Sequence, residues 1–382
     1  MVVIPNPDFQ LVVGDVRTGR VHARLPFAAL KWGQRLNAAG GMSATLRPHA
    51  KQLAHYDLRS LTATVKQFMA VDYRGTLLEG GPIWTRPYDQ DTGELKLNGL
   101  GLWSIFDRRK NVPGAALLPG AKVTEVGIYP RNLHRGSIAR ELVRISIQDN
   151  PYGGDLPVVL PASIAGTEGR DYPGYGLSWL GDDLRTLTKE QNGPDLRFKP
   201  RYVSGDPTRV EWALEHGAID ILQQDGPDWE WDAKVERSAV AKLGVDQDGT
   251  GVAAMAWTPG SGQEQEMKMA AARDASLVSA GYPWTETEES ANSIEDEAVL
   301  QSLASRKLAD SMRPWDTWSM TVRADRTPRL GSYLPGDWAR VNVPDDHPIL
   351  PPGGKVRVRI LSVDGDHTAD VKLSVAPIQG SV

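Results

Sequence analysis

The chain has 382 residues, a formal net charge of −5 and no cysteine. At roughly 150 residues per domain, this length predicts two to three domains with a sizeable core. The lack of cysteine excludes disulfides, thiolate metal sites and a cysteine nucleophile, and the slightly acidic balance argues against general nucleic-acid binding. The 38 glycines, 27 prolines and 12 tryptophans indicate many short strands joined by turns.

The N-terminal sequence does not resemble a secretory signal. No basic segment precedes its only apolar run, and Pro5 and Pro7 interrupt that run. The chain also lacks a run of about 18 apolar residues, so we expect no membrane span. Together with the missing cysteines, these features fit a chain that folds in a reducing cytosol.

The first third of the chain alternates apolar and polar residues as strands do. The clearest unit is residues 80–109, where apolar residues at strand spacing flank the turn residues 88–93; this pattern predicts a β-hairpin. We expect the chain to leave the sheet over residues 104–109. With further strands expected between residues 9 and 78, residues 1–112 predict one small, closed or nearly closed β-barrel.

Residues 113–205 have a different pattern. Apolar residues at helical spacing behind Ser137 predict a short helix over 137–147, with Ser137 as its N-cap. The same spacing from Leu180 to Leu187 predicts a second helix that ends near Gly193. Residues 151–175 are rich in glycine and proline and predict a loop.

Strand patterns return after residue 206 and again after residue 318. Between them lies the clearest helix of the chain, expected near residues 293–312: Ser293 and Asp296 form a capping-box pair, an apolar face follows, and Pro314 ends the helix. The last strands, with a turn at 364–366, predict a second barrel-like block. The predicted fold class is therefore mainly β with minor α.

The sequence contains none of the common catalytic motifs: it has no HExxH, GxxxxGK[ST] or GxSxG, and no GxGxxG between a strand and a helix. None of its seven histidines pair at i, i+4 spacing for a helical metal site. We therefore nominate no catalytic, cofactor-binding or metal-binding residue.

Two acidic turns deserve comparison with calcium loops. Asp246 and Asp248 resemble the start of such a loop. Thr250, however, occupies the third acidic position and the closing glutamate is absent, so the pattern favours a hairpin turn. A similar turn contains Asp364, Asp366, His367 and Asp370 and has the same two interpretations.

Two clusters also allow alternative interpretations. Trp229 and Trp231, two residues apart on one strand and flanked by acids, could stack a sugar ring or simply pack; packing is favoured. Arg108, Arg109 and Lys110 could line a nucleic-acid path or be solvated and ion-paired, and the second is favoured.

Several short segments together resemble a known family. They are LKWGQRLNAAGGMSATL (30–46), LLEGGPIWT (77–85), GELKLNGLGLWSIFDRR (93–109), LGDDLRTLTKE (180–190), VEWALEHG (210–217), DQDGTG (246–251) and YLPGDWARVNV (333–343). The pattern resembles siphophage minor tail proteins of actinobacterial viruses that serve as the tail hub. That family is similar in turn to the baseplate hub protein of contractile-tailed phages.

The resemblance implies a homotrimer at the tail tip, in which two related barrels per subunit form a pseudo-sixfold ring around a DNA channel. In this layout residues 1–112 form the first barrel, and 206–232 with 318–382 form the second. Residues 113–205 are an α+β insertion domain, and residues 233–317 are an outer domain.

The implied partners are the sixfold distal tail ring, the tape measure protein and other tail-tip or receptor-binding minor tail proteins. DNA would pass without specific binding, along a channel wall expected to be polar or acidic. The implied location is the virion tail tip, after assembly in the host cytoplasm, with no enzymatic activity and no cofactor.

Two other functions stay open from the residues. One is a carbohydrate-binding module that uses tryptophans as platforms, which binding of cell-wall polysaccharide by the monomer would favour. The other is a cell-wall hydrolase with an active site assembled from scattered acids, which loss of wall clearing after a single Asp or Glu substitution would favour.

Overall fold

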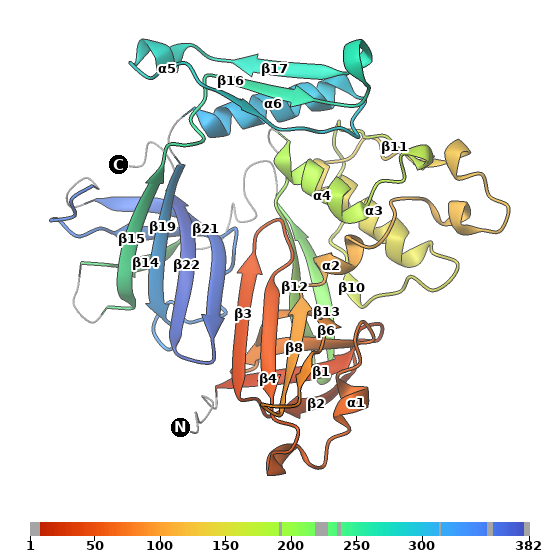
Figure 1. The fold of residues 1–382 in the computed structure, drawn as a ribbon, viewed down its shortest axis with the longest axis vertical. Helices are drawn as coiled ribbons and strands as arrows, with labels where there is room; N and C mark the ends of the chain where they lie inside the picture. Colours follow the sequence, from red (N-terminus) through yellow and green to blue (C-terminus); the bar gives the residue numbers. More distant parts are fainter. Residues whose placement is uncertain are drawn as a thin grey trace.

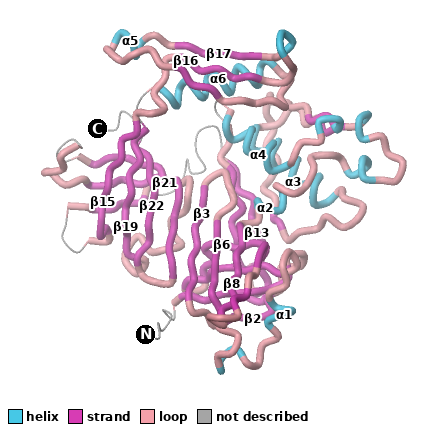
Figure 2. The backbone as a smooth tube through the Cα atoms, in the orientation of Figure 1, coloured by secondary structure: helices cyan, strands magenta, loops and turns pink. Residues whose placement is uncertain are grey.

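The computed structural model describes residues 8–190, 193–217, 228–234, 238–312, 315–349 and 354–377. Strands predominate over helices in these residues (Figure 2). Fourteen of the described strands lie in one sheet, and the others form three small sheets. The predicted mainly β class is therefore confirmed.

The first third of the chain is almost entirely strand. Its elements are β1 (Phe9–Asp15), β2 (Val21–Leu25), β3 (Ala29–Arg35), β4 (Gly41–Leu46), α1 (Leu58–Leu61), β5 (Gln67–Tyr73), β6 (Thr76–Thr85), β7 (Tyr88–Asp89), β8 (Glu94–Leu100) and α2 (Trp103–Phe106). The predicted hairpin over 80–109 is confirmed, since β6 and β7 both pair antiparallel with β8. The chain then leaves the sheet into α2, as expected.

The last part of the chain forms a second set of strands. They are β14 (Trp229–Asp232), β15 (Val240–Asp248), β19 (Trp315–Arg323), β20 (Trp338–Asn342), β21 (Lys355–Asp366) and β22 (Asp370–Pro377). The long antiparallel hairpin of β21 and β22 turns at the predicted acidic segment. Residues 218–227, which belong to the predicted second barrel, lie outside the described residues.

The two sets of strands meet at a seam between β3 and β21, where Lys31–Arg35 pair antiparallel with Ser362–Asp366. The main sheet therefore runs β15-β19-β22-β21-β3-β4-β8-β6-β5-β1-β2 (Figure 1). Beside this path, β20 pairs with β21, β14 with β20, and β7 with β8. A closed or nearly closed barrel and a second barrel-like block were expected, but the described ladders join both sets of strands in one sheet and do not pair its ends, β15 and β2. The physical reason is that each set satisfies an exposed strand edge by pairing with the other.

One apolar core lies under both halves of this sheet. Leu30 and Trp32 of the first half belong to the same buried cluster as Trp318, Val358 and Leu373 of the second. Each of these side chains is at most 3% exposed. The two halves are therefore held together by shared burial as well as by backbone hydrogen bonds.

Between the two halves the chain forms a helical region. Its elements are β9 (Gly127–Ile128), α3 (Arg135–Gln148), β10 (Val158–Val159), β11 (Tyr172–Pro173), α4 (Leu180–Lys189), β12 (Leu196–Val203) and β13 (Asp206–His216). Both predicted helices are present. The N-cap of α3 is His134, whose Nδ1 accepts from the Gly136 N–H, so the prediction of Ser137 was wrong. The buried Ser137 hydroxyl instead accepts from the Ile164 N–H at 2.8 Å.

Strand β13 pairs with β12 and β10 and not with the strands of the second half. Its Trp212 packs edge-on against Phe68 of β5, with ring centroids 5.5 Å apart. A second apolar core, which also contains α3 and α4, is built on this side of the first half.

Residues 249–312 form a separate outer unit, at the top of Figure 1. It consists of β16 (Met255–Pro259), β17 (Met269–Arg273), α5 (Ser276–Ser279), β18 (Glu286–Glu288) and α6 (Glu297–Ser311). Helix α6 packs Leu300 and Ala304 against Ala270 of β17. The helix begins four residues later than predicted because Asp296, and not Ser293, caps it; Pro314 lies outside the described residues.

Candidate functional site

One face of the main sheet is polar across both halves of the chain. Side chains alternate between the two faces of a strand, and here the apolar set turns toward the shared core. On the other face, register places one row of residues across seven strands: Lys242, Thr321, Lys372, Asp364, Gly33, Gly41 and Leu100. A neighbouring row contains Gly244, Ser319, Ser374, Ser362 and Arg35. We call these two rows and the adjacent Lys31, Ser43, Asn98, Arg323, Asp366 and Asp370 the polar face.

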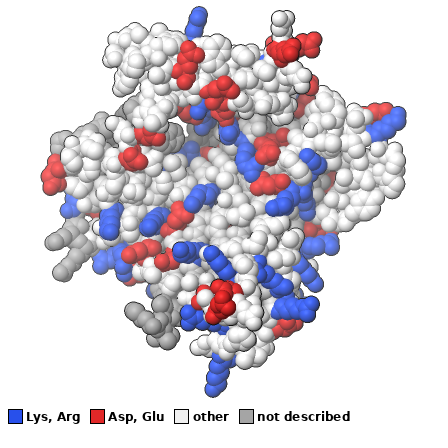
Figure 3. Space-filling view, viewed as in Figure 1, with Lys and Arg blue, Asp and Glu red and all other residues white. Residues whose placement is uncertain are grey.

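The polar face carries charges of both signs. Arg35 pairs with Asp364 across the seam at 2.7 Å, and Arg323 pairs with Asp370 at 2.9 Å. Over the strands at the centre of Figure 3, basic and acidic side chains are interleaved. The residues that define the face include five basic and three acidic side chains: Lys31, Arg35, Lys242, Arg323, Lys372, Asp364, Asp366 and Asp370. The surface is thus polar and carries both signs, and it is neither a continuous basic strip nor an acidic wall.

A groove of about 670 Å³ follows the seam on this face. Gly33, Gly41 and Gly365 line it together with Lys31 and Asp364. A Cβ at Gly41 would have no neighbour within 4 Å. The groove is therefore a depression between polar side chains that is open over Gly41, whereas Asp364 and Trp32 fill the space beside Gly33 and Gly365.

Next to the seam, β6 carries a buried carboxyl group, that of Glu79, which is 7% exposed. Its Oε1 accepts the Gly80 N–H at 3.0 Å, and the backbone at Gly40 and Gly101 lies close against it. Burial raises the pKa of Glu79 to about 8, although the Gly80 hydrogen bond and the positive charge of Arg35 act in the opposite direction. The carboxyl group is therefore mainly protonated at neutral pH.

The turn after β3 joins three parts of the chain. Asn37 has a left-handed backbone with φ of 58°, and its side chain accepts from the Leu196 N–H at 2.8 Å and donates to Asp195 at 2.9 Å. Asp195 also pairs with Arg359 of β21. This joint connects the first half, the helical region and the second half.

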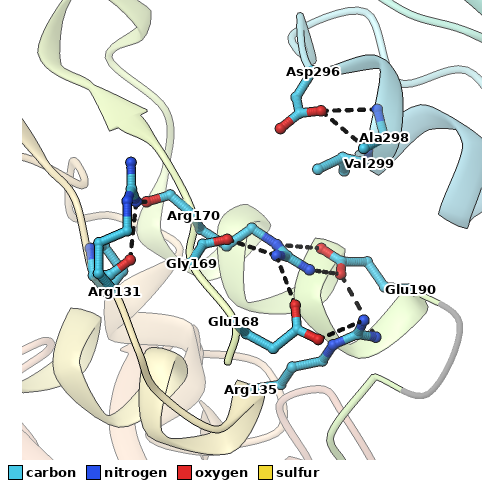
Figure 4. A network of polar contacts seen from close by, with 10 residues as sticks. Arg131, Arg135, Glu168, Gly169, Arg170, Glu190, Asp296, Ala298 and Val299 are labelled. Atoms are coloured by element: carbon cyan, nitrogen blue, oxygen red, sulfur yellow. Dashed lines mark hydrogen bonds and ion pairs between the residues drawn. The ribbon is translucent and has the colours of Figure 1, made fainter. Parts of the chain in front are cut away.

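A second polar joint lies between the helical region and the outer unit (Figure 4). Glu190, only 1% exposed, pairs with Arg170 and lies 3.9 Å from Arg135. Glu168 pairs with the same two arginines at 3.2 and 3.3 Å. Arg306 of α6 donates to the Glu190 backbone oxygen at 3.3 Å. Because the buried Glu190 carboxylate is partnered by two arginines that are only partly exposed, the network is suited to holding the two segments together.

The tryptophan pair nominated from the sequence does not form an open platform. Trp231 is 1% exposed, and its ring lies edge-on to Tyr333 with centroids 5.1 Å apart. Trp229 donates its indole N–H to Asp337 at 3.1 Å. Both side chains are used for packing, which was the favoured interpretation.

The two acidic turns close on themselves. Asp248 accepts from the Thr250 N–H at 2.8 Å and from its hydroxyl at 2.6 Å, and Asp366 accepts from the Thr368 N–H at 2.7 Å. Within the described ranges, no group of three or more His, Asp or Glu side chains is placed to hold a metal ion.

The basic cluster at the end of the hairpin is used within the protein. Arg108 stacks over Trp84 at 4.4 Å and Lys110 over Trp179 at 3.5 Å. Arg109 donates to the backbone oxygens of Ser146 and Gly154, both at 3.0 Å. Arg109 and Lys110 therefore attach the end of the hairpin to the helical region, Arg108 packs within the hairpin, and the three do not line an open basic path.

Sequence reasoning missed Glu79, Glu190 and the tryptophans of the outer unit. Glu79 had a signal, because it is the one charged residue in the apolar segment LLEGGPI. Glu190 and Trp257 had none, since their partners Arg170 and Glu286 are 20 and 29 residues away. Trp284 lies two residues from Glu286, but this spacing alone does not show that one carboxylate accepts from two tryptophans.

No protein-family model matches the sequence, and no curated protein matches it. The described helices include none long and apolar enough to cross a membrane.

Solved structures do match the fold, and two of them are described as tail proteins. A tail protein from Neisseria meningitidis MC58 aligns with a TM-score of 0.57 and 14% identity, over 98% of this chain and 97% of that one. The 43 kDa tail protein of prophage MuSo2 from Shewanella oneidensis aligns with a TM-score of 0.54 and 11% identity, over 96% and 98%. The chain thus shares its fold with both proteins over nearly its whole length.

Proposed function

We propose that this chain is a structural subunit of a phage tail tip, where it forms a trimeric hub that joins the sixfold distal tail ring to the threefold tip and surrounds the DNA channel. The observation that carries this proposal is the polar face, which runs without interruption across the two halves of one chain. The fold shared with two tail proteins supports it.

In this proposal the polar face is the channel wall. It presents hydroxyl groups, glycines and charges of both signs, with Asp364, Asp366 and Asp370 set among the basic side chains, so DNA would meet no continuous basic strip to bind. Three subunits with two halves each would present six wall segments, which suits contact with a sixfold ring on one side and a threefold tip on the other.

In this proposal residues 1–112, strands β14 and β15, and residues 318–382 supply the ring, because β14 and β15 pair within the main sheet. The helical region with β13 and the outer unit of residues 249–312 lie outside it. Compared with the layout expected from the sequence, this moves β13 out of the second block and β15 into it. The expected partners are two further copies of the chain, the distal tail ring, the tape measure protein and other tail-tip proteins. The role is structural, without catalysis, in a particle assembled in the host cytoplasm.

The first test is the mass of the purified chain by light scattering over a concentration series. A species near three times 41.7 kDa is expected. A mass that stays at one chain at every concentration contradicts self-assembly of the hub.

A second test asks whether the polar face lines the channel. Because the chain has no cysteine, a single cysteine can be introduced and labelled at one chosen position. Ser319→Cys lies on the polar face and Ser279→Cys on exposed α5. After labelling with biotin-maleimide, both trimers should carry biotin, but only the Ser279→Cys trimer should bind streptavidin, which is too large for the channel. Equal streptavidin binding by both would contradict the channel assignment.

A further inference from the structure

The outer unit exposes one face of its three-stranded sheet. On β16, Ala256 and Thr258 are buried toward α6, and Ala270 of β17 joins the same small core. Alternate residues point to the opposite side of the sheet. They are Met255, Trp257, Pro259, Met269, Ala271 and Arg273. Arg273 is exposed and pairs in register with Met255 at one end of the sheet, and we call the five other residues the outer face.

The outer face points away from the rest of the molecule. Helix α6 covers the other side of the sheet and contacts the helical region through Arg306, which donates to Glu190. In Figure 1 the helix accordingly lies between the outer sheet and the remaining elements. Met269 is 53% exposed, so the apolar surface is open to solvent.

Two tryptophans at this face are held in place by one carboxylate. Trp257 donates its indole N–H to Glu286 at 2.7 Å, and Trp284 donates to the other oxygen of Glu286 at 3.0 Å. Trp284 is 50% exposed. Because both indole groups are already hydrogen-bonded, the rings offer contact area that needs little further ordering on binding.

The surroundings of the outer face are strongly acidic. Residues 249–297 contain nine acidic and two basic side chains, a formal charge of −7, whereas the whole chain carries −5. Exposed acids border the face on β18 and on the segment before β17: Glu264, Glu266, Glu286 and Glu288. An apolar centre of aromatic and Met side chains with a polar rim has the composition of a protein–protein interface.

We propose that the outer face docks a second protein whose surface presents an apolar patch bordered by lysines and arginines. The acidic rim attracts such a partner and repels nucleic acid and anionic polymers. It also disfavours a twofold contact with a second copy, in which like charges would meet. The proposal rests on the outer unit alone and stands whether or not the chain forms a hub.

The test is selection of a displayed random-peptide library on the full-length chain. Recovered peptides should combine apolar residues with Lys and Arg. Trp257→Ala and Met269→Glu should each lower their binding by about tenfold or more, as expected for anchors in an interface centre. The control Leu100→Ala, at an exposed apolar residue of the polar face, should leave binding unchanged.

A charge-reversed chain sharpens the test. Glu266→Lys with Glu288→Lys should shift the selected peptides toward acidic sequences. If Trp257→Ala unfolds the outer unit, Met269→Glu still tests the proposal, because a substitution at the mostly exposed Met269 should leave the fold intact. The proposal is overturned if the peptides show no charge preference, or if Met269→Glu binds them as well as the parent chain. Binding of a neutral oligosaccharide that Trp284→Ala abolishes would overturn it in favour of a sugar site.

Discussion

At the scale of single residues, the seam between the two halves depends on small and uncharged groups next to Glu79. The carboxyl group of Glu79 lies against Gly40 and Gly101, where a side chain would collide with it. Gln34 donates its amide to the Leu78 backbone oxygen in the same place. This region is tightly packed, so it should tolerate added volume or charge poorly.

Gly40→Ala should therefore destabilise the protein, because the new Cβ would collide with the Glu79 carboxyl group and the Gly33 backbone oxygen. We expect a loss of about 1–3 kcal/mol in the free energy of unfolding, as for other overpacked cores. The neighbouring Gly41→Ala is the matched control, since its Cβ would point into open space. Urea unfolding of both variants checks this, and equal losses would contradict the packing argument.

Glu79→Gln tests whether the buried carboxyl group of Glu79 is protonated in the folded chain. Because the folded pKa is about 8 and the ordinary value is 4.5, the folded chain keeps a proton that the unfolded chain releases between these pH values. The contribution of this group to the free energy of unfolding is thus fully present below about pH 4.5, and it is lost as the pH rises through about 8. The two pKa values differ by about 3.5, so at about 1.4 kcal/mol per pKa unit the loss is on the order of 5 kcal/mol.

The glutamine variant lacks this titration, so its stability relative to the parent chain should rise between pH 5 and pH 9. Chemical denaturation at several pH values measures the difference. Glu125→Gln, at an exposed carboxylate paired with Lys122, is the control and should show little pH dependence. A constant difference for Glu79→Gln would show that the carboxyl group is not held protonated.

At the scale of elements, the start of α6 depends on which side chain accepts hydrogen bonds from its first backbone N–H groups. The Asp296 carboxylate accepts from the Ala298 N–H at 2.8 Å and from the Val299 N–H at 3.4 Å. It satisfies backbone donors of the first turn and places a negative charge at the positive end of the helix dipole. The helix supports the inner side of the outer sheet, so the outer face depends on it.

Asp296→Ala should cost about 1 kcal/mol of stability in the outer unit, because these donors lose their acceptor. Ser293→Ala, at the exposed position that the sequence pattern named as cap, should change stability by no more than about 0.5 kcal/mol. Amide hydrogen exchange in the first turn of α6 distinguishes the two variants. Faster exchange in Ser293→Ala alone would place the cap where the sequence pattern put it.

At the scale of the whole molecule, the shared core predicts that the two halves unfold together. Leu30 and Val358 come from opposite halves, and both are fully buried in one cluster. Leu30→Ala and Val358→Ala should lower the midpoint of the same calorimetric transition. Leu300→Ala, in the separate core of the outer unit, should act on a local transition. Two transitions, with each half-specific variant shifting only one, would indicate independent halves.

The amino-acid sequence by itself determined the elements whose signals are local. The hairpin of β6 and β8 and the helices α3, α4 and α6 follow from periodicity and turn residues that act over a few positions. The starts of α3 and α6 shifted because capping depends on which side chain actually reaches the first backbone donors.

Only the tertiary structure decided the pairing of β3 with β21, the burial of Glu79 and the orientation of the outer face. Arg35 and Asp364 form an ion pair across the seam, and no local sequence pattern predicts that these two strands pair. Burial and edge pairing depend on contacts between distant segments, and these are selected by the free energy of the whole fold. The surfaces proposed here for function therefore arise from the packing of elements that the sequence specifies one at a time.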